Sequence, residues 1–203
     1  LTETEEKPCK DIEEKLRNLK IVIDWVRHER VGHLFKNFIF VLTNISSDPE
    51  LRSLLVEHSL PHFTALFEFQ EKQKTDFDSF LQLCQIFRNF SFEYENPKLK
   101  DAFADTQIIG SIAKTLEESE FTLFQKNRLK LILVDLLWVF HTNIDFCKSD
   151  TPLAPFRYDG DKKQLEEWIK DEDLLALAEA NPDSCDIKEK LQGLDQIFLN
   201  YSN

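Results

Sequence analysis

Glycine is scarce in this chain, and methionine is absent from it. Four glycines occur among 203 residues, and each of them stands alone in the sequence. Isolated glycines exclude the G-x-G-x-x-G and G-x-x-x-x-G-K loops that cradle phosphate groups, and with them nucleotide binding through such loops. Few glycines also disfavour the turn-rich connections of β-sandwiches and barrels. The lack of methionine, even at position 1, favours a segment of a longer protein.

Paired cysteines are missing as well. The chain contains no C-x-x-C motif, and its cysteines lie far apart, at Cys9, Cys84, Cys147 and Cys185. The sequence therefore predicts reduced thiols and no zinc or redox site. Three sequons for N-glycosylation would fit a secreted protein, and they begin at Asn44, Asn89 and Asn200. The first two end apolar helices, where a sugar would obstruct packing, so we expect a cytoplasmic or nuclear protein.

A surplus of basic residues is also absent. Lysine and arginine together number 25 against 37 acidic residues, which gives a formal net charge of -12. Duplex nucleic acid and anionic membranes both require a basic surface, so we expect no direct binding to either. A basic partner fits this charge better. The longest apolar runs, such as Leu129 to Phe140, are interrupted by charges and are too short to span a bilayer.

Signatures of catalysis are lacking too. There is no G-x-S-x-G elbow, and Cys84 lies in an apolar helical stretch where a small buried thiol is favoured over a nucleophile. His58 and His62 have the spacing of metal ligands, but Pro61 separates them and no cysteine pair is near. The acidic run at Glu117, Glu118 and Glu120 is typical of a solvated helix face. We therefore expect a protein that is not an enzyme and that binds neither metal nor cofactor.

Helical periodicity extends through almost the whole chain. A first amphipathic helix is predicted by apolar residues spaced three and four apart, namely Ile12, Leu16, Leu19, Ile23 and Val26. A second helix, from Val31 to about Ser46, is apolar on most sides and must be buried. Large aromatic side chains are abundant, with 18 phenylalanines, which favours packing between regular elements. The fold class predicted is all-α.

Proline and asparagine mark the corners between these helices. Ser47-Asp48-Pro49 offers a helix N-cap followed by proline at the first helical position, and Pro61 is predicted to open the next helix. Asn96-Pro97 repeats this plan shortly after Asn89, and Ile108 begins another helix. Each corner therefore separates a short helix from the longer ones beside it.

The corners recur with a period. Aligning FVLTNISSDPELRSLL with QIFRNFSFEYENPKLKDAF places Asn44 and Asn89 45 residues apart, and Pro49 and Pro97 48 residues apart. A third apolar helix, NRLKLILVDLLWVFHTNID, brings Asn143 to the matching position 54 residues after Asn89. Periods of this length are typical of helical repeats, whose units cannot bury their apolar faces alone. Three related units are therefore predicted.

These residues resemble the armadillo family. The motifs VLTNIS, IFRNFS and VFHTNI are similar to the end of the third helix of an armadillo unit, and the resemblance covers about residues 30 to 147. It implies a right-handed α-solenoid of about three repeats. The glycine that the family places between its first two helices has a counterpart only at Gly110, and a more general HEAT-like stack stays open.

The whole chain, residues 1–203, is expected to form one armadillo-like domain. Residues 1–30 would supply an N-terminal capping helix, 31–147 the repeats and 148–161 an exposed loop rich in proline and aspartate. Residues 162–203 would supply capping helices, at about 162–180 and 185–200. The last helix carries an apolar stripe that suits a cap, formed by Ile187, Leu191, Leu194, Ile197 and Phe198.

The resemblance also implies a binding site. In the armadillo family the asparagine of the third helix hydrogen-bonds the backbone of an extended peptide in a concave groove. The matching residues are Asn44, Asn89 and Asn143, and their neighbours Arg88, Trp138 and His141 would line the same groove. Each asparagine fits a helix C-cap equally well, and Trp138 fits the core. The function expected is a non-catalytic scaffold that binds a basic peptide of a partner protein, and the alternative is a self-assembly element that forms a homodimer.

Overall fold

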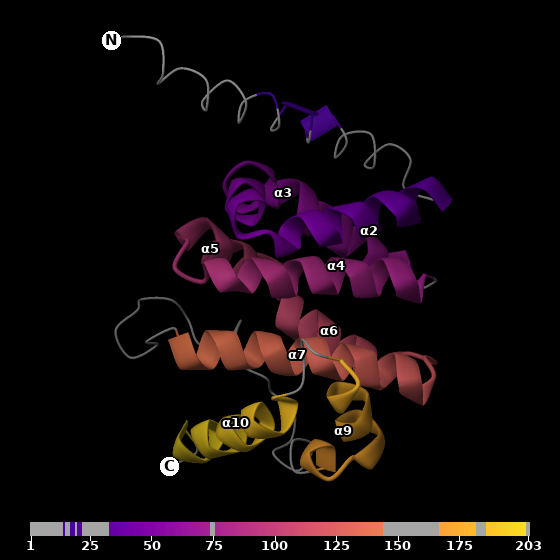
Figure 1. The fold of residues 1–203 in the computed structure, drawn as a ribbon, viewed down its shortest axis with the longest axis vertical. Coiled ribbons are helices and arrows are strands. Elements are labelled where there is room, and N and C mark those ends of the chain that lie inside the picture. The colour runs from indigo at the N-terminus through magenta and orange to yellow at the C-terminus, as the bar shows by residue number, and fades with distance from the viewer. Residues whose placement is uncertain are drawn as a thin grey trace.

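The computed structural model describes residues 33–73, 76–143, 167–181 and 186–201, together with the single positions 14, 17, 18, 20 and 21. These ranges hold eight α-helices, one 3-10 helix and no strand, so the predicted all-α class is confirmed for them (Figure 1). None of their helices has both the length and the apolar composition that crossing a lipid bilayer requires. Of the predicted helix at 12–26, only positions 14, 17, 18, 20 and 21 are described, and they are helical; the predicted loop at 148–161 lies outside the described residues.

The helices lie in successive layers along the long axis of the molecule (Figure 1). In chain order they are α2 (His33–Ser47), α3 (Pro49–Gln73), α4 (Phe77–Phe90), the 3-10 helix η1 (Ser91–Glu93), α5 (Pro97–Thr106), α6 (Ile108–Glu118), α7 (Leu123–Asn143), α9 (Glu172–Glu179) and α10 (Ile187–Tyr201). Helix α4 packs against α2 and α3 on one side and against α7 on the other. Helices α9 and α10 cover the far side of α7.

Local side-chain chemistry sets several helix starts. The Asp48 carboxylate accepts a hydrogen bond from the Leu51 amide at 3.0 Å, and the Asn96 side chain accepts one from the Lys98 amide at 3.0 Å. Both are N-caps, as the sequence predicts, because each satisfies a first-turn N–H that has no partner within the helix. Gln107 turns the chain between α5 and α6 with φ of 47°, a left-handed conformation that glycine adopts more easily.

Pro61 does not open a helix, and that prediction is wrong. Helix α3 continues through it from Pro49 to Gln73. Proline has no N–H for the carbonyl four residues earlier, which here belongs to Glu57. The Lys98 ammonium of α5 donates to that carbonyl at 3.4 Å and also pairs with the Glu57 carboxylate. A distant residue thus satisfies the group that would otherwise favour ending the helix.

The predicted C-terminal helix at 162–180 is also corrected. Residues 167–169 are helical, but this helix ends at Ile169, and α9 begins after Asp171. The Asp171 carboxylate accepts a hydrogen bond from the Leu174 amide at 3.0 Å. This N-cap starts a new helix because its extended backbone cannot continue the old one.

Phenylalanine rings form the centre of the core. The Phe87 ring has no exposed surface and lies edge-to-face with the rings of Phe67, Phe90 and Phe103, at centroid distances of 5.5, 5.8 and 5.7 Å. Such aromatic pairs add to the stabilisation from burial itself. On the neighbouring helices α2 and α7, Leu42 and Leu133 are fully buried and Phe38 is half-buried.

Cys84 belongs to the same core, as predicted. It is completely buried and has no disulfide partner. Burial raises the pKa of its thiol well above the usual value, because the apolar surroundings disfavour a thiolate. The side chain is therefore a small packing residue without nucleophilic character.

Polar contacts between neighbouring layers join residues a nearly constant distance apart in sequence. Arg52 and Glu93 pair across 41 residues, the side chains of Asn89 and Ser46 across 43, and Arg88 and Asp135 across 47. The spacing is close to the 45 residues that separate Asn44 from Asn89. These contacts join α3 to η1, α2 to α4, and α4 to α7.

Candidate functional site: a cleft along α4 and α7

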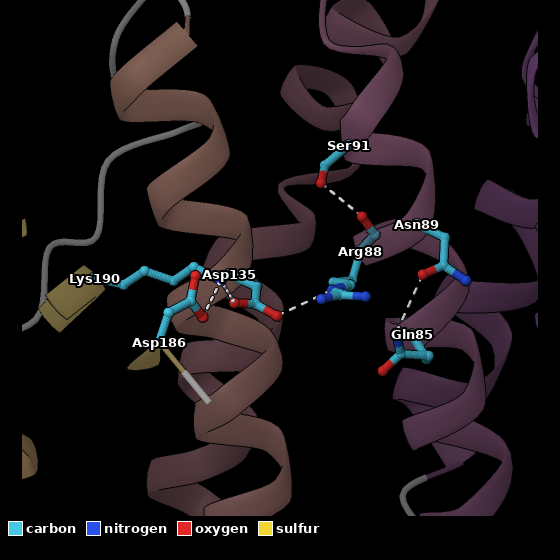
Figure 2. Close-up of polar contacts among 7 residues, drawn as sticks. All are labelled: Gln85, Arg88, Asn89, Ser91, Asp135, Asp186 and Lys190. Atoms are coloured by element: carbon cyan, nitrogen blue, oxygen red, sulfur yellow. Dashed lines mark hydrogen bonds and ion pairs between the residues drawn. The ribbon is translucent and has the colours of Figure 1, made fainter. Parts of the chain in front are cut away.

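The three predicted asparagines occupy different environments. Asn44 is exposed on α2. Asn89 is 4% exposed, and its Nδ2 donates to the Ser46 hydroxyl at 2.9 Å and the Thr43 carbonyl at 3.4 Å. Its Oδ1 accepts from the side-chain amide of Gln85 at 3.2 Å (Figure 2). The Asn89 amide therefore fastens α4 to α2.

Asn143 is the last residue of α7, where its side chain bonds locally. Its Nδ2 donates to the Val139 carbonyl at 3.0 Å and to the Thr142 hydroxyl at 3.1 Å. This satisfies one of the carbonyls left free at a helix end. Its side-chain carbonyl is the part of the amide available to a ligand.

Three of the six predicted residues come together. Arg88, Trp138 and Asn143 line one cavity of about 390 Å³, whose other walls are Phe92, Tyr94, Asp135, Val139, Asp186 and Lys190. A second cavity of about 140 Å³ shares Arg88 and Asp135 with the first and is completed by Leu81, Gln82, Gln85, Arg128, Leu131, Ile132, Leu177 and Asn181. We call these two neighbouring cavities together the α4–α7 cleft. Asn44, Asn89 and the buried His141 do not line it.

A chain of charges forms the floor of the cleft (Figure 2). The Arg88 Nε lies 3.0 Å from the Asp135 carboxylate, and the Lys190 ammonium bridges Asp135 and Asp186 at 2.8 and 2.9 Å. Asp135 is only 5% exposed, so both cations are needed to compensate its buried charge. The chain ties α4, α7 and α10 together and fixes the shape of the floor.

The state of Lys190 follows from its surroundings. Burial by itself disfavours the ammonium, but the hydrogen bonds and charges of Asp135 and Asp186 outweigh that effect, and the pKa of Lys190 is raised. Lys190 therefore stays charged at physiological pH and keeps the bridge intact.

An aromatic side chain stands at the open side of the cleft. Phe92, in η1, is 47% exposed, and the guanidinium groups of Arg52 and Arg88 each lie 5.3 Å from its ring centroid. Guanidinium groups at this distance are attracted to the ring face. The two arginines therefore hold an exposed aromatic surface in a fixed place.

Trp138 is positioned by a glycine. A Cβ atom added at Gly193 of α10 would lie 2.3 Å from Cζ3 of the Trp138 ring. Helix α10 approaches α7 this closely only because position 193 has no side chain. The glycine thereby places Asp186 and Lys190, on the same C-terminal segment, against the cleft.

Several lining residues were missed from sequence although helical spacing marks them. On α7, the residues that precede Asn143 at successive intervals of three or four lie on the same helix face and line the cleft: Val139, Asp135, Ile132 and Arg128. The same steps from Arg88 reach Gln85 and Gln82 on α4. The α10 residues carried no such signal, because tertiary packing alone brings them here.

The lining of the cleft combines several kinds of chemical group. It offers side-chain amides, aromatic faces and paired charges, and no lining residue is a cysteine or histidine. Within the described ranges, no three histidine, cysteine, aspartate or glutamate side chains gather as metal ligands.

Comparison with family models, curated proteins and solved structures finds no significant match to the chain.

Proposed function

We propose that this chain is a non-catalytic interaction module that binds an extended segment of a partner protein in the α4–α7 cleft. The observation that carries the proposal is the meeting of Arg88, Trp138 and Asn143 with the exposed Phe92 in one cleft. Aromatic and arginine side chains are the residues most enriched among strong contributors to protein–protein binding. The cleft thus offers anchoring groups on a rigid floor.

We further propose that the layers form an armadillo-like, right-handed solenoid. Helices α3 and α4 would form one unit, and α5, α6 and α7 the next, with α9 and α10 as the C-terminal cap. The contacts across 41 to 47 residues support this, because each unit of a solenoid touches only its neighbours.

The amides of the cleft suit the backbone of an extended peptide. Gln82 and Gln85 on α4 face the same cleft as Asn143 on α7 and Asn181 after α9. Side-chain amides carry donors and acceptors that can bond the N–H and C=O groups of a passing chain. Asn143 would contribute its carbonyl, because its Nδ2 already donates within α7. The charge of -12 favours a basic partner and speeds its encounter at low salt.

A matched pair of phenylalanine variants tests this proposal. Peptides are selected from a displayed random library against the immobilised protein, and their affinities are measured by calorimetry. Phe92→Ala should weaken the best peptide by roughly tenfold or more, as expected for an aromatic anchor worth over 1 kcal/mol. Phe124→Ala removes a ring on α7 that is even more exposed, at 60%, and does not line the cleft, so it should leave the affinity unchanged.

Unchanged affinity in Phe92→Ala would rule out the cleft as the binding site. Equal losses of affinity in both variants would also rule out the cleft, because they would reflect nonspecific hydrophobic binding to exposed rings. Circular dichroism should show that both variants keep the helical fold.

A second candidate function is self-assembly through α2. Three large apolar side chains are exposed there, with Leu34 at 56%, Phe40 at 55% and Val41 at 47%. Exposed apolar groups that cluster on one helix are typical of interaction surfaces. Light scattering coupled to size exclusion should then show a concentration-dependent dimer that Phe40→Glu abolishes. A monomer at all concentrations would leave the peptide module as the proposal.

A further inference from the structure

A second cleft lies between α3 and α5 and shares no residue with the α4–α7 cleft. Its volume is about 490 Å³. Its floor is apolar, with Val56, Leu60 and Ala102 among its residues, and its rim carries the carboxylates of Glu57, Asp101 and Asp105. We call it the α3–α5 cleft. An apolar floor with an acidic rim is a surface of defined chemistry.

The cleft lies where Pro61 interrupts the hydrogen bonds of α3. Lys98 reaches across from α5 to the free Glu57 carbonyl and to the Glu57 carboxylate. The two helices are therefore held together at this point by one lysine. That lysine neutralises one of the three carboxylates on the rim.

The other two carboxylates form no ion pair within the described part of the chain, because Lys98, which also lines the cleft with His58, pairs with Glu57. Asp101 and Asp105 are exposed and stand four residues apart on α5, where like charges repel each other. Asp105 also lies in the last turn of α5, where the helix dipole disfavours a negative charge. Both positions therefore weaken the isolated helix. A cation from a bound partner would reduce both the repulsion between the two carboxylates and the unfavourable effect of the helix dipole on Asp105.

We propose that the α3–α5 cleft binds a basic segment of a partner protein. Two lysine or arginine side chains of that segment pair with Asp101 and Asp105, and their aliphatic stems lie on the apolar floor. Carboxylates four residues apart on a helix are separated by about 6 Å along its axis. Alternate residues of an extended chain are about 6.7 Å apart, so side chains two positions apart match them.

Charge decides between the possible occupants. A second copy of this chain would bring its own charge of -12 toward an acidic rim, which disfavours it. A basic segment is complementary to the rim. The inference stands independently of the α4–α7 cleft, since neither cleft contributes a residue to the other.

Nuclear magnetic resonance can test the α3–α5 cleft with defined probes. The isotope-labelled full chain is titrated with a capped Ala-Lys-Ala-Lys-Ala peptide and, separately, with its glutamate counterpart. The lysine peptide should shift the amide signals of residues 56–64 and 98–106, and the glutamate peptide should not. Asp101→Asn with Asp105→Asn should weaken the lysine peptide by roughly two- to thirtyfold, the effect of losing two exposed ion pairs.

The control removes the same charge elsewhere. Glu117→Gln with Glu120→Gln changes two exposed carboxylates outside the cleft and should leave the affinity unchanged. Equal weakening by both double variants would mean that bulk charge alone attracts the peptide, which overturns the site. Signal changes confined to the α4–α7 cleft would overturn it too. The Phe92→Ala experiment is unaffected by either result.

Discussion

A single amide connects two layers of this fold. Asn89 is buried between α4 and α2, and it uses its donors and its acceptor within the protein, on Ser46, Thr43 and Gln85. A polar group in such a place stabilises only while its partners remain, because a buried group without one has lost its water.

Replacing Asn89 with alanine should therefore lower stability. Because the Ser46 hydroxyl and the Thr43 carbonyl would lose this partner, we expect the free energy of unfolding to fall by about 1–3 kcal/mol. Urea denaturation followed by circular dichroism measures it. Asn44→Ala is the control, since Asn44 is exposed, and it should change stability by less than about 0.5 kcal/mol.

The same variants separate a structural role from a ligand role. If Asn89 serves the fold alone, Asn89→Ala should bind the selected peptide with unchanged affinity at temperatures where it is folded. A loss of affinity without a loss of stability would instead assign Asn89 to the partner. Calorimetry on both variants distinguishes the two outcomes.

Among the helices, the pairing of α7 with α10 depends on the absence of one side chain. Gly193 lies directly against the Trp138 ring. The α10 residues Lys190 and Leu191, the latter fully buried, belong to the same interface. A small displacement of α10 would therefore disturb both the ion bridge and the core.

Two glycine-to-alanine changes should have opposite effects. Gly193→Ala forces either the Trp138 ring or α10 to move, and we expect it to destabilise the protein by about 1–3 kcal/mol. Gly110→Ala in α6 meets nothing within 4 Å and should stabilise it by up to about 1 kcal/mol, because alanine favours helix. Urea denaturation measures both. Stabilisation by both changes would contradict the close contact between α7 and α10.

The start of α9 should respond to acid. Burial alone would raise the pKa of Asp171, but hydrogen bonds from Lys130 and the Leu174 amide outweigh it, and the pKa is lowered. A lowered pKa in the folded state adds stability above the unfolded value, which is about 3.9, and this is lost as pH falls through the folded pKa. The effect is thus confined to acidic pH.

Lys130→Met tests this linkage. The variant lacks the ion pair at 2.9 Å, so its stability should fall less steeply than that of the wild type as pH drops below about 4. Urea denaturation at a series of pH values measures the slope. Parallel slopes in the two proteins would show that Lys130 does not hold the carboxylate.

For the whole molecule, features that depend on neighbouring residues could be predicted from the sequence. Features that depend on contacts between residues far apart in the sequence could not. Asn96-Pro97 was readable as a helix start because capping involves neighbouring residues. Pro61 was misread because the group that compensates it, Lys98, is 37 residues away in the sequence. The resemblance to the armadillo family implied one groove for Arg88 and Trp138, and both residues line the cleft. The sequence could not predict that Lys190 lines the same cleft, because its position depends on how α10 packs against α7.

The aromatic centre of the core has a consequence for how the chain folds as it is made. The rings packed directly around Phe87 belong to Phe67, Phe90 and Phe103, so these contacts lie within residues 67–103. Contacts that are short in sequence close small loops and form quickly. During synthesis, the layers of α3, α4 and α5 can therefore assemble as soon as residue 103 clears the ribosome. Helix α7 would then pack against these folded helices once it has been synthesised.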